Sequence, residues 1–204
     1  MAISFKQIDL LDREKTIVLF PIGSMEQHGP HLPNGMDTHI AVDLMKDAAE
    51  KLAGELDFLL LPAMPVGQSP EHMDFPGTLT LSAETLISVI KEIAASVSRH
   101  GFKKMMILNG HGGNIAAIGA AAFDIRDAYG LKVFMFNVWG LIVDMATKLT
   151  DRQASNRTDA HGGEIETSLV MYLYPEKLKK EWAVDEKNER LASSEIIGMG
   201  GPIQ

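Results

Sequence analysis

The sequence predicts an α/β fold, layered αβα with a mostly parallel central sheet. Short apolar segments alternate with longer amphipathic segments four times along the chain. Parallel strands need long crossover connections, usually helices, so this alternation favours a parallel sheet with helices on both faces. With 204 residues, 46% of them hydrophobic, the chain can bury a sizeable core. We therefore expect one domain over residues 1–204.

Four segments are expected to be strands. The first, TIVLFPIG at residues 16–23, is apolar without interruption, as a strand buried on both faces should be. The other three follow the same pattern and lie at residues 58–67, 103–110 and 132–140.

Helices are expected between and after these strands. In the first helix the apolar residues recur on one face, and Gly54 provides a stop signal. Ser82 is a good N-cap for the second helix. The stretches at residues 69–82 and 150–163 show no period and are predicted to be irregular. The expected helices span residues 37–54, 83–100, 114–129, 141–149 and 163–175.

Composition argues against several classes of function. The formal net charge is −8 and the Lys and Arg residues are scattered, whereas nucleic-acid binding needs a clustered basic face. The chain has no cysteine, which excludes a disulfide framework and a thiolate zinc site. We find no signal-peptide pattern and no run near the ~18 apolar residues of a membrane span. We expect a cytoplasmic protein that binds neither nucleic acid nor membranes.

Ionisable side chains concentrate where predicted strands end. The first strand leads into GSMEQHGPHLPNGMDTH, the third leads into NGHGGN, and HGGEIETS stands where the last helix begins. Folds of this class bind ligands beyond the carboxyl ends of their parallel strands, so we expect these three clusters to form one crevice. The clusters carry Glu26, His28, Asp37, His111, His161 and Glu164.

The residue types in this crevice indicate metal-dependent hydrolysis. In an extended segment Glu26 and His28 present their side chains on one face, and Asp37 can fold back near them. Imidazoles and carboxylates without sulfur suit Zn²⁺, Mn²⁺ or Fe²⁺. With His111 and Glu164 the set is too large for one four-coordinate ion but suits two ions that share a carboxylate. Such ions generate hydroxide near neutral pH and polarise carbonyl groups.

Simpler interpretations apply to some of these features. Glu26 and His28, taken alone, fit an ordinary polar turn equally well. NGHGGN could hold a phosphate before a helix, but it lacks a lysine and the P-loop spacing. We interpret His72 and His100 as surface or hydrogen-bonded core histidines. Trp139 is expected either in the core or in the wall of the pocket.

Four motifs resemble those of the creatininase (creatinine amidohydrolase) family in order and spacing: GSMEQHGPHLPNGMDTH, HMDFPGTLTLS, NGHGGN and HGGEIETS. The resemblance covers residues 16–175. It implies a layered α/β fold, two divalent metal ions per chain, and hydrolysis of C–N bonds in small, often cyclic, amides. It also implies a homo-oligomer, commonly a hexamer.

The resemblance implies a role for each candidate residue. Glu26, Asp37 and His111 would hold one metal ion, and His28 with the bridging Asp37 would hold the other. His161 matches the family's catalytic histidine, a general acid that protonates the leaving nitrogen.

One position departs from the creatinine-hydrolysing members. They have a further metal-binding glutamate two residues after the histidine that matches His111, where this chain has Gly113. We expect Glu164 to replace that ligand, as in many other branches of the family. Glu166 is expected to assist catalysis by orienting an imidazole or a ligand.

These expectations favour an amidohydrolase that cleaves a C–N bond of a small amide or formamide. Creatinine is not the expected substrate, because of Gly113 and because SNRTDAHGG offers no tryptophan for the pocket. Two alternatives on the same site stay open: a peptide-processing hydrolase of cofactor maturation, and a hydrolase that opens a cyclic sugar ketone. A non-catalytic oligomer stabilised by metal ions is the alternative of another class. Family members usually continue beyond the position of Gln204, so we also expect a truncated or divergent C-terminus.

Overall fold

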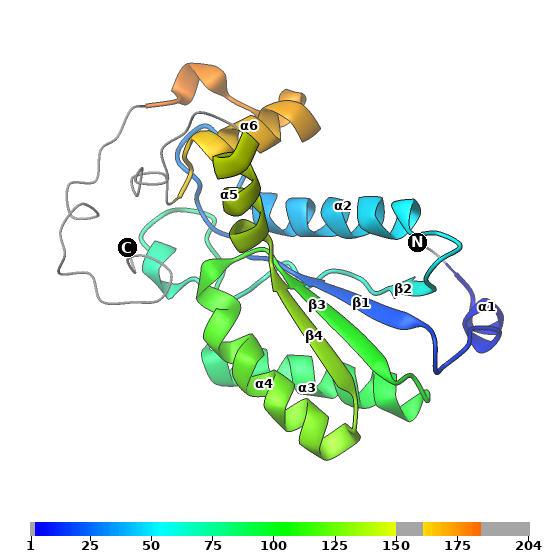
Figure 1. Cartoon of the computed structure of the whole chain (residues 1–204). Coiled ribbons are helices and arrows are strands. Elements are labelled where there is room, and N and C mark those ends of the chain that lie inside the picture. The colour runs from blue at the N-terminus through cyan, green and yellow to red at the C-terminus, as the bar shows by residue number, and fades with distance from the viewer. Residues whose placement is uncertain (1–2, 150–160, 185–204) are drawn as a thin grey trace.

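The central element of the structure, a computed structural model, is a four-stranded parallel sheet between two layers of helices (Figure 1). The structure describes residues 3–149 and 161–184. The strands lie in the order β2-β1-β3-β4, and every pair is parallel. The predicted layered α/β fold with a parallel sheet is therefore confirmed.

The strands are aligned so that three of them end at one level. They are β1 (Ile17–Ile22), β2 (Phe58–Leu60), β3 (Lys104–Asn109) and β4 (Lys132–Asn137). Ile22 at the end of β1 pairs with Asn109 at the end of β3, and Asn109 pairs with Asn137 at the end of β4. The side chains that follow these strands are consequently brought to one edge of the sheet.

Two strands are shorter than predicted. β2 stops at Leu60, because Pro62 and Pro65 lack the amide hydrogen that a sheet ladder needs. The chain still runs beside β1 after that point, where the Met64 amide donates to the Pro21 carbonyl (3.0 Å). β4 ends at Asn137, and helix α5 begins at the next residue.

The helices agree with the predicted ones to within a few residues, except that α1 was not predicted. The Ser82 side chain accepts a hydrogen bond from the Thr85 amide, which confirms the predicted N-cap of α3. In the predicted loop, Pro70–His72 form a single 3₁₀ turn. The helices are α1 (Phe5–Asp9), α2 (Met36–Lys51), α3 (Ala83–Arg99), α4 (Ile115–Tyr129), α5 (Val138–Leu149) and α6 (Glu164–Leu173).

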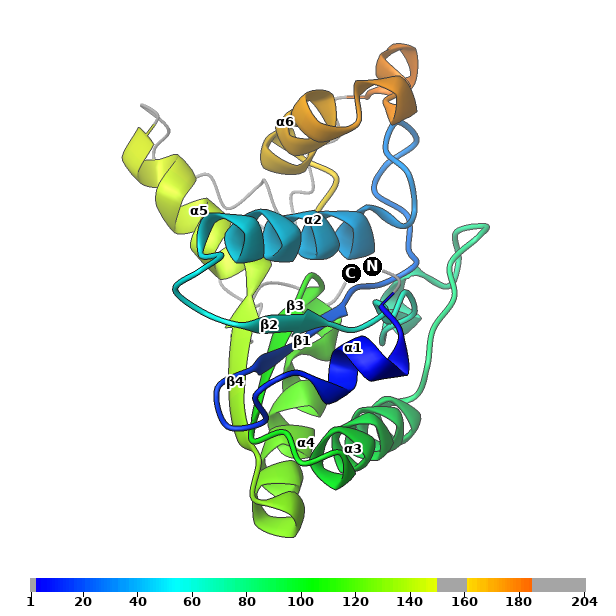
Figure 2. The same ribbon diagram turned by 90° about the vertical axis from the view of Figure 1, so that its right-hand side faces the viewer.

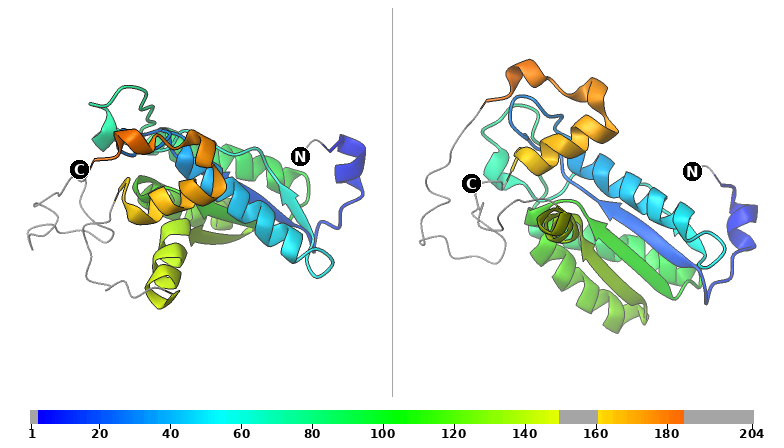
Figure 3. Two further views of the ribbon diagram at one scale, coloured as in Figure 1. Left: turned by 90° about the horizontal axis from the view of Figure 1, so that it is seen from above. Right: turned by 45° about the horizontal axis from the view of Figure 1, so that its top comes forward.

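Alternate residues of the strands point into two separate cores. Val18 and Phe20 of β1 pack against α3 and α4 on one face, whereas Leu19 packs against α2 on the other. Helix α6 lies over the same face as α2, as two perpendicular views show (Figures 2 and 3). The Tyr174 hydroxyl just after α6 donates a hydrogen bond to the Asp43 carboxylate of α2. This contact holds the C-terminal part of the described chain against the sheet domain.

Over residues 3–149 and 161–184, none of the helices combines the length and the apolar character that a membrane span requires.

We expect Ile107→Ala to destabilise the fold, because Ile107 on β3 is fully buried in the core beneath α3 and α4. Truncating a buried aliphatic side chain to alanine lowers the free energy of unfolding by about 2–5 kcal/mol. Urea denaturation would measure the change. Leu10→Ala, at a residue 86% exposed, is the matched control and should stay within about 0.5 kcal/mol of wild type. Equal effects of the two substitutions would contradict this description of the core.

Candidate metal centre

A single side chain, Asn114, ties together the strand ends that carry the candidate site. Its Nδ2 donates to the Gly23 carbonyl after β1 (3.0 Å) and to Asn109 Oδ1 at the end of β3 (3.1 Å). Its Oδ1 accepts from the Gln68 amide on the chain that follows β2 (2.8 Å). Asn114 is fully buried, so these bonds replace the water that its amide would otherwise bind. Asn114, the second asparagine of NGHGGN, therefore joins the segments that follow β1 and β2 to the end of β3 by hydrogen bonds.

The turn after β3 also packs directly on the start of α2. A Cβ atom at Gly110 would lie 2.5 Å from the Asp37 carbonyl oxygen, so only glycine allows this approach. The close packing brings His111, the next residue, beside the Asp37 side chain.

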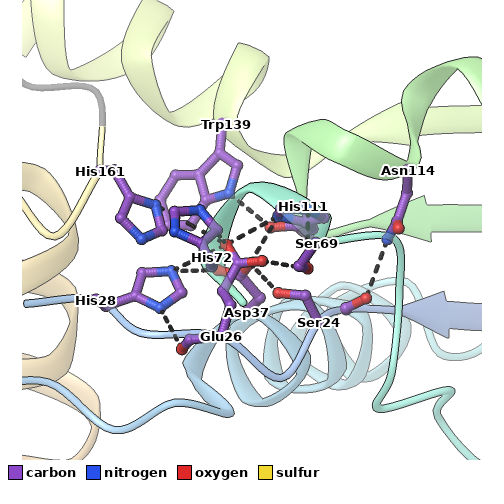
Figure 4. Close-up of polar contacts among 12 residues, drawn as sticks. Ser24, Glu26, His28, Asp37, Ser69, His72, His111, Asn114, Trp139 and His161 are labelled. Carbon is purple, nitrogen blue, oxygen red and sulfur yellow. Dashed lines mark hydrogen bonds and ion pairs between the residues drawn. The ribbon is translucent and has the colours of Figure 1, made fainter. Parts of the chain in front are cut away.

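Two buried carboxylates form the middle of the site (Figure 4). The side chains of Glu26 and Asp37 are each about 1% exposed. Ser69 Oγ donates to Glu26 Oε2 (2.5 Å), and Ser24 Oγ donates to Asp37 Oδ2 (2.7 Å). Each carboxylate thus has one oxygen bonded to a serine and another that faces imidazole rings.

His28 turns a ring nitrogen with a lone pair toward these carboxylates. Its Nδ1 lies 3.2 Å from the backbone carbonyl oxygen of Glu26, which can only accept, so Nδ1 carries the hydrogen of the neutral ring. Nε2 is then the atom available as a ligand. It lies 3.2 Å from Asp37 Oδ1 and 3.9 Å from Glu166 Oε1.

His111 is oriented in the same way, except that the roles of its two ring nitrogens are exchanged. Its Nε2 lies 2.9 Å from the Gln68 carbonyl oxygen and therefore carries the hydrogen of the neutral ring. Its Nδ1 lies 3.0 Å from Glu26 Oε1 and 3.5 Å from Asp37 Oδ2. A carbonyl that fixes the outer nitrogen and leaves the inner one free is typical of metal-binding histidines.

The candidate metal ligands form two groups of three residues that share Asp37. Ligand atoms of Glu26, Asp37 and His111 lie within 4.8 Å of one another, and so do those of His28, Asp37 and Glu166. Asp37 Oδ1 is buried and accepts no hydrogen bond, although His28 Nε2 is only 3.2 Å away. A nitrogen that faces a carboxylate oxygen at this distance needs either a proton or a metal ion between the two atoms. Among the described residues, a third such group contains Glu26, His28 and His161.

The site attracts positive charge strongly. Burial opposes the charged form of His28, but Asp37, Glu166 and Glu26 outweigh burial and raise the pKa of His28 to about 9. Burial likewise opposes charge on His111, and the bonds and charges of Asp37 and Glu26 raise its pKa to about 10. Burial favours the neutral forms of both carboxyl groups, yet the imidazoles hold the pKa values of Glu26 and Asp37 below their usual range. In the metal-free chain, protons on the histidines supply the charge that metal ions would supply.

His161 lies at the rim of this centre. Its Nε2 donates to the Gln27 carbonyl oxygen, and its Nδ1 lies 3.9 Å from Glu26 Oε1. Burial first, and then the positive charge of His28, lowers the pKa of His161 to about 4. The ring is therefore neutral at pH 7, with its lone pair on the nitrogen that faces the carboxylates.

The structure brings Glu166, and not Glu164, to the centre. Glu166 is 8% exposed and faces His28, and its Oε2 accepts from the Gly162 amide, whereas Glu164 is exposed. Two residues that are two positions apart on a helix are rotated by about 200° about its axis, so their side chains point in nearly opposite directions. Glu164, expected as the replacement ligand, lies outside all three groups of candidate ligands among the described residues.

Gly113 has no room for a side chain. A Cβ atom there would lie 2.2 Å from the Gln68 carbonyl oxygen and 2.5 Å from His111 Nε2. A glutamate at this position would displace the carbonyl that orients His111. The local packing at position 113 therefore excludes the glutamate expected in creatinine-hydrolysing members of the family.

Three residues of the centre were not identified from the sequence. Ser24 and Ser69 orient the carboxylates, and the alternation Ser24-x-Glu26-x-His28 was a signal for the first of them. His72, interpreted as a surface or hydrogen-bonded core histidine, is 4% exposed and its Nδ1 lies 3.1 Å from Gln27 Nε2, as a hydrogen-bonded core histidine would. It also stacks on His161 with ring centroids 4.3 Å apart, which the sequence did not indicate. Its place inside the motif HMDFPGTLTLS was the signal available.

Trp139 serves the packing at the back of the centre. It contacts the core between the sheet and α2, and its indole N–H donates to the Gly110 carbonyl (2.6 Å). Both of its expected surroundings, core and pocket wall, are compatible with this position.

The fold and the site define a layered α/β protein with a buried carboxylate–imidazole centre suited to divalent metal ions. The family model described as creatinine amidohydrolase matches residues 2–202. The chain therefore belongs to the creatininase family, a family of metal-dependent amidohydrolases.

Curated relatives have different substrates. The mycofactocin precursor peptide peptidase of Mycobacterium ulcerans is 34% identical over 164 residues, 78% of this chain and 59% of the relative. The creatinine amidohydrolase of Pseudomonas putida is 28% identical, and the match covers 83% of this chain and 68% of the relative. The 3-dehydro-scyllo-inosose hydrolase of Thermotoga maritima is 29% identical, with 89% and 58% covered. The chain thus spans less than two thirds of the length of two of these relatives.

Solved structures agree in fold. A creatininase with Mn superposes with a TM-score of 0.72 at 28% identity, covering 84% of this chain and 70% of the other. A mutant creatininase complexed with creatine gives 0.73 at 26% identity, with 90% and 75% covered.

We expect Zn²⁺ binding at pH 7 to release about two protons per chain. His28 and His111 are protonated below their pKa values of about 9 and about 10, and each must lose a proton to bind a metal ion. Metal affinity should consequently rise with pH through this range. Calorimetry in buffers of different ionisation enthalpy would count the protons. His111→Ala should lower the count by about one, while the exposed His100→Ala should not change it. No proton release in the wild type would contradict imidazole ligation.

Proposed function

We propose that this protein is a hydrolase with two divalent metal ions, Zn²⁺, Mn²⁺ or Fe²⁺, that cleaves a C–N bond in a small amide or formamide. The observation that carries the proposal is the pair of three-residue groups that share Asp37. Glu26, Asp37 and His111 would hold one ion, and His28, Asp37 and Glu166 the other. Bound ions of this kind would supply a hydroxide nucleophile near neutral pH and would polarise a carbonyl group.

The surrounding residues would keep the ligands in place. Ser24 and Ser69 each occupy one carboxylate oxygen, which leaves the other oxygen of Asp37 and of Glu26 directed at the ions. The backbone carbonyls of Glu26 and Gln68 fix the tautomers of His28 and His111. Such partners raise ligand basicity and commonly contribute 10- to about 100-fold in metal affinity.

His161 would transfer the proton. Its Nε2–H is engaged with the Gln27 carbonyl, so the free atom is Nδ1, on the side of the carboxylates. Because the ring is neutral at pH 7, Nδ1 would accept the proton that water loses on becoming the hydroxide nucleophile, and would then give that proton to the departing nitrogen. The C–N bond breaks as that nitrogen becomes a neutral amine.

A peptide is the second candidate substrate, favoured by the 34% identity with the peptide peptidase. A cyclic ketone, as in the inosose hydrolase, would use the same nucleophile without releasing a nitrogen-bearing product. A screen of formamides, cyclic amides, short peptides and cyclic ketones with product analysis separates these classes. A nitrogen-bearing product from the small amides alone would support the first proposal.

We expect two metal ions per chain in the wild type and a value approaching one in Glu166→Gln. The reason is that the carboxylate of Glu166 faces His28 and Asp37 in the second group. Elemental analysis after reconstitution with Zn²⁺ and Mn²⁺ measures the ratio. Glu164→Gln, on the same turn of α6, is the matched control and should retain two ions. A loss in Glu164→Gln and none in Glu166→Gln would reverse the assignment.

We expect His161→Ala to keep its metal content and to lose turnover by about 10²- to 10⁴-fold, the usual contribution of a positioned acid–base group. Elemental analysis and steady-state kinetics on a substrate found in the screen test both parts. Wild-type turnover in this variant would remove His161 from the mechanism.

A further inference from the structure

The ring of His161 is fixed by contacts with other segments of the chain. Its Nε2 donates to the Gln27 carbonyl, and its ring centroid lies 4.2 Å from that of His28 and 4.3 Å from that of His72. The two ring planes of His161 and His72 differ by only 19°, which is a stacked arrangement (Figure 4). Stacking on a ring face restricts rotation of the ring about its Cβ–Cγ bond.

His72 is itself held in one orientation and one tautomer. Its Nδ1 lies 3.1 Å from Gln27 Nε2, and Gln27 Oε1 accepts from the Gly29 amide (2.7 Å). The Gly29 contact identifies Oε1 as the acceptor, so Gln27 Nε2 is the donor and His72 Nδ1 accepts. The hydrogen of the neutral His72 ring therefore lies on Nε2. The backbone is fixed as well, since the His72 amide donates to the Ser69 carbonyl (3.2 Å).

These contacts do not give His72 a role as a metal ligand. Its Nε2 lies 3.8 Å from Glu26 Oε1 and carries a hydrogen rather than a lone pair. Within residues 3–149 and 161–184, no group of candidate ligands contains His72. A buried imidazole that is held at one nitrogen and packed on a neighbouring ring is suited to supporting that neighbour.

We propose that His72 is a positioning residue that fixes the ring of His161 with Nδ1 directed at the reaction centre. Gln27 couples the two rings, because its backbone carbonyl holds His161 while its side-chain amide holds His72. The functional part of this inference rests on the proposed function, in which His161 Nδ1 carries the proton. Misplacement of a reacting group by about 1 Å lowers rates by roughly 10²-fold.

Three substitutions of His72 separate stacking from hydrogen bonding. His72→Phe keeps a ring on His161, His72→Asn keeps an acceptor near the position of Nδ1, and His72→Ala removes both. We expect His72→Ala to lower kcat by about 100-fold with KM and metal content unchanged, and His72→Phe to restore most of the loss. Rescue by His72→Asn and not by His72→Phe would overturn the proposal, because the role would then be to hold the loop. Wild-type kcat in His72→Ala would overturn it too.

A readout independent of activity is the tautomer of His161 in the full-length, Zn²⁺-loaded protein. In ¹⁵N-histidine NMR, the wild type and His72→Phe should show the Nε2–H form alone, and His72→Ala should show a mixture of both tautomers. An unchanged His161 tautomer in His72→Ala would contradict the positioning role. This spectrum decides the role of His72 even if the metal count or the substrate screen contradicts the proposed function. The exposed His100→Ala is the control and should leave the His161 signals in place.

Discussion

Two carboxylates buried side by side, Glu26 and Asp37, set the constraint on which the rest of this site depends. A buried carboxylate is strongly unfavourable unless hydrogen bonds and positive charge surround it. Ser69 and Ser24 provide one hydrogen bond to each carboxylate, and the remaining oxygens face imidazole nitrogens that lie 3.0–3.2 Å away. The raised pKa of His28 is the electrostatic counterpart of this arrangement, since the carboxylates outweigh the burial that opposes its charge. A pair of divalent cations meets the same demand with four positive charges, which is why we propose them as the natural occupants.

The parallel sheet makes such a concentration of charge possible by aligning the ends of its strands. Because β1, β3 and β4 end at one level, segments far apart in sequence meet at one edge. Asn114 then joins three of these segments by hydrogen bonds, and the glycine at position 110 lets the chain after β3 touch the start of α2. Gly110 and Asn114 of the NGHGGN motif thus help to place His111 beside the carboxylates.

The second half of the proposed centre comes from α6, a helix that follows the sheet in the chain. At Gly113 the neighbouring Gln68 carbonyl and His111 ring exclude any side chain, whereas Glu166 Oε1 lies 3.9 Å from His28 Nε2. A ligand supplied from a separate helix leaves the segment after β3 free to pack closely on the chain that follows β2. It also makes the position of Glu166 depend on how α6 sits over α2. The Tyr174–Asp43 hydrogen bond, which fixes that arrangement, therefore bears indirectly on the geometry of the centre.

The sequence by itself determined the class of fold, and the structure brings together five of the six residues that its motifs were expected to place in one crevice, namely Glu26, His28, Asp37, His111 and His161. Continuous apolar segments and amphipathic periodicity depend on local spacing, so most strands and helices could be predicted. The exceptions are the short helix α1, β2 shortened by Pro62 and Pro65, and β4 shortened where α5 begins directly after it. The tertiary structure alone decided which glutamate of HGGEIETS reaches the centre. That choice depends on the rotation of α6 about its axis, and two residues on one helical turn are equally plausible until packing fixes which face is buried. Packing between distant segments likewise decided that His72 stacks on His161, because no pattern along the chain records which rings will touch.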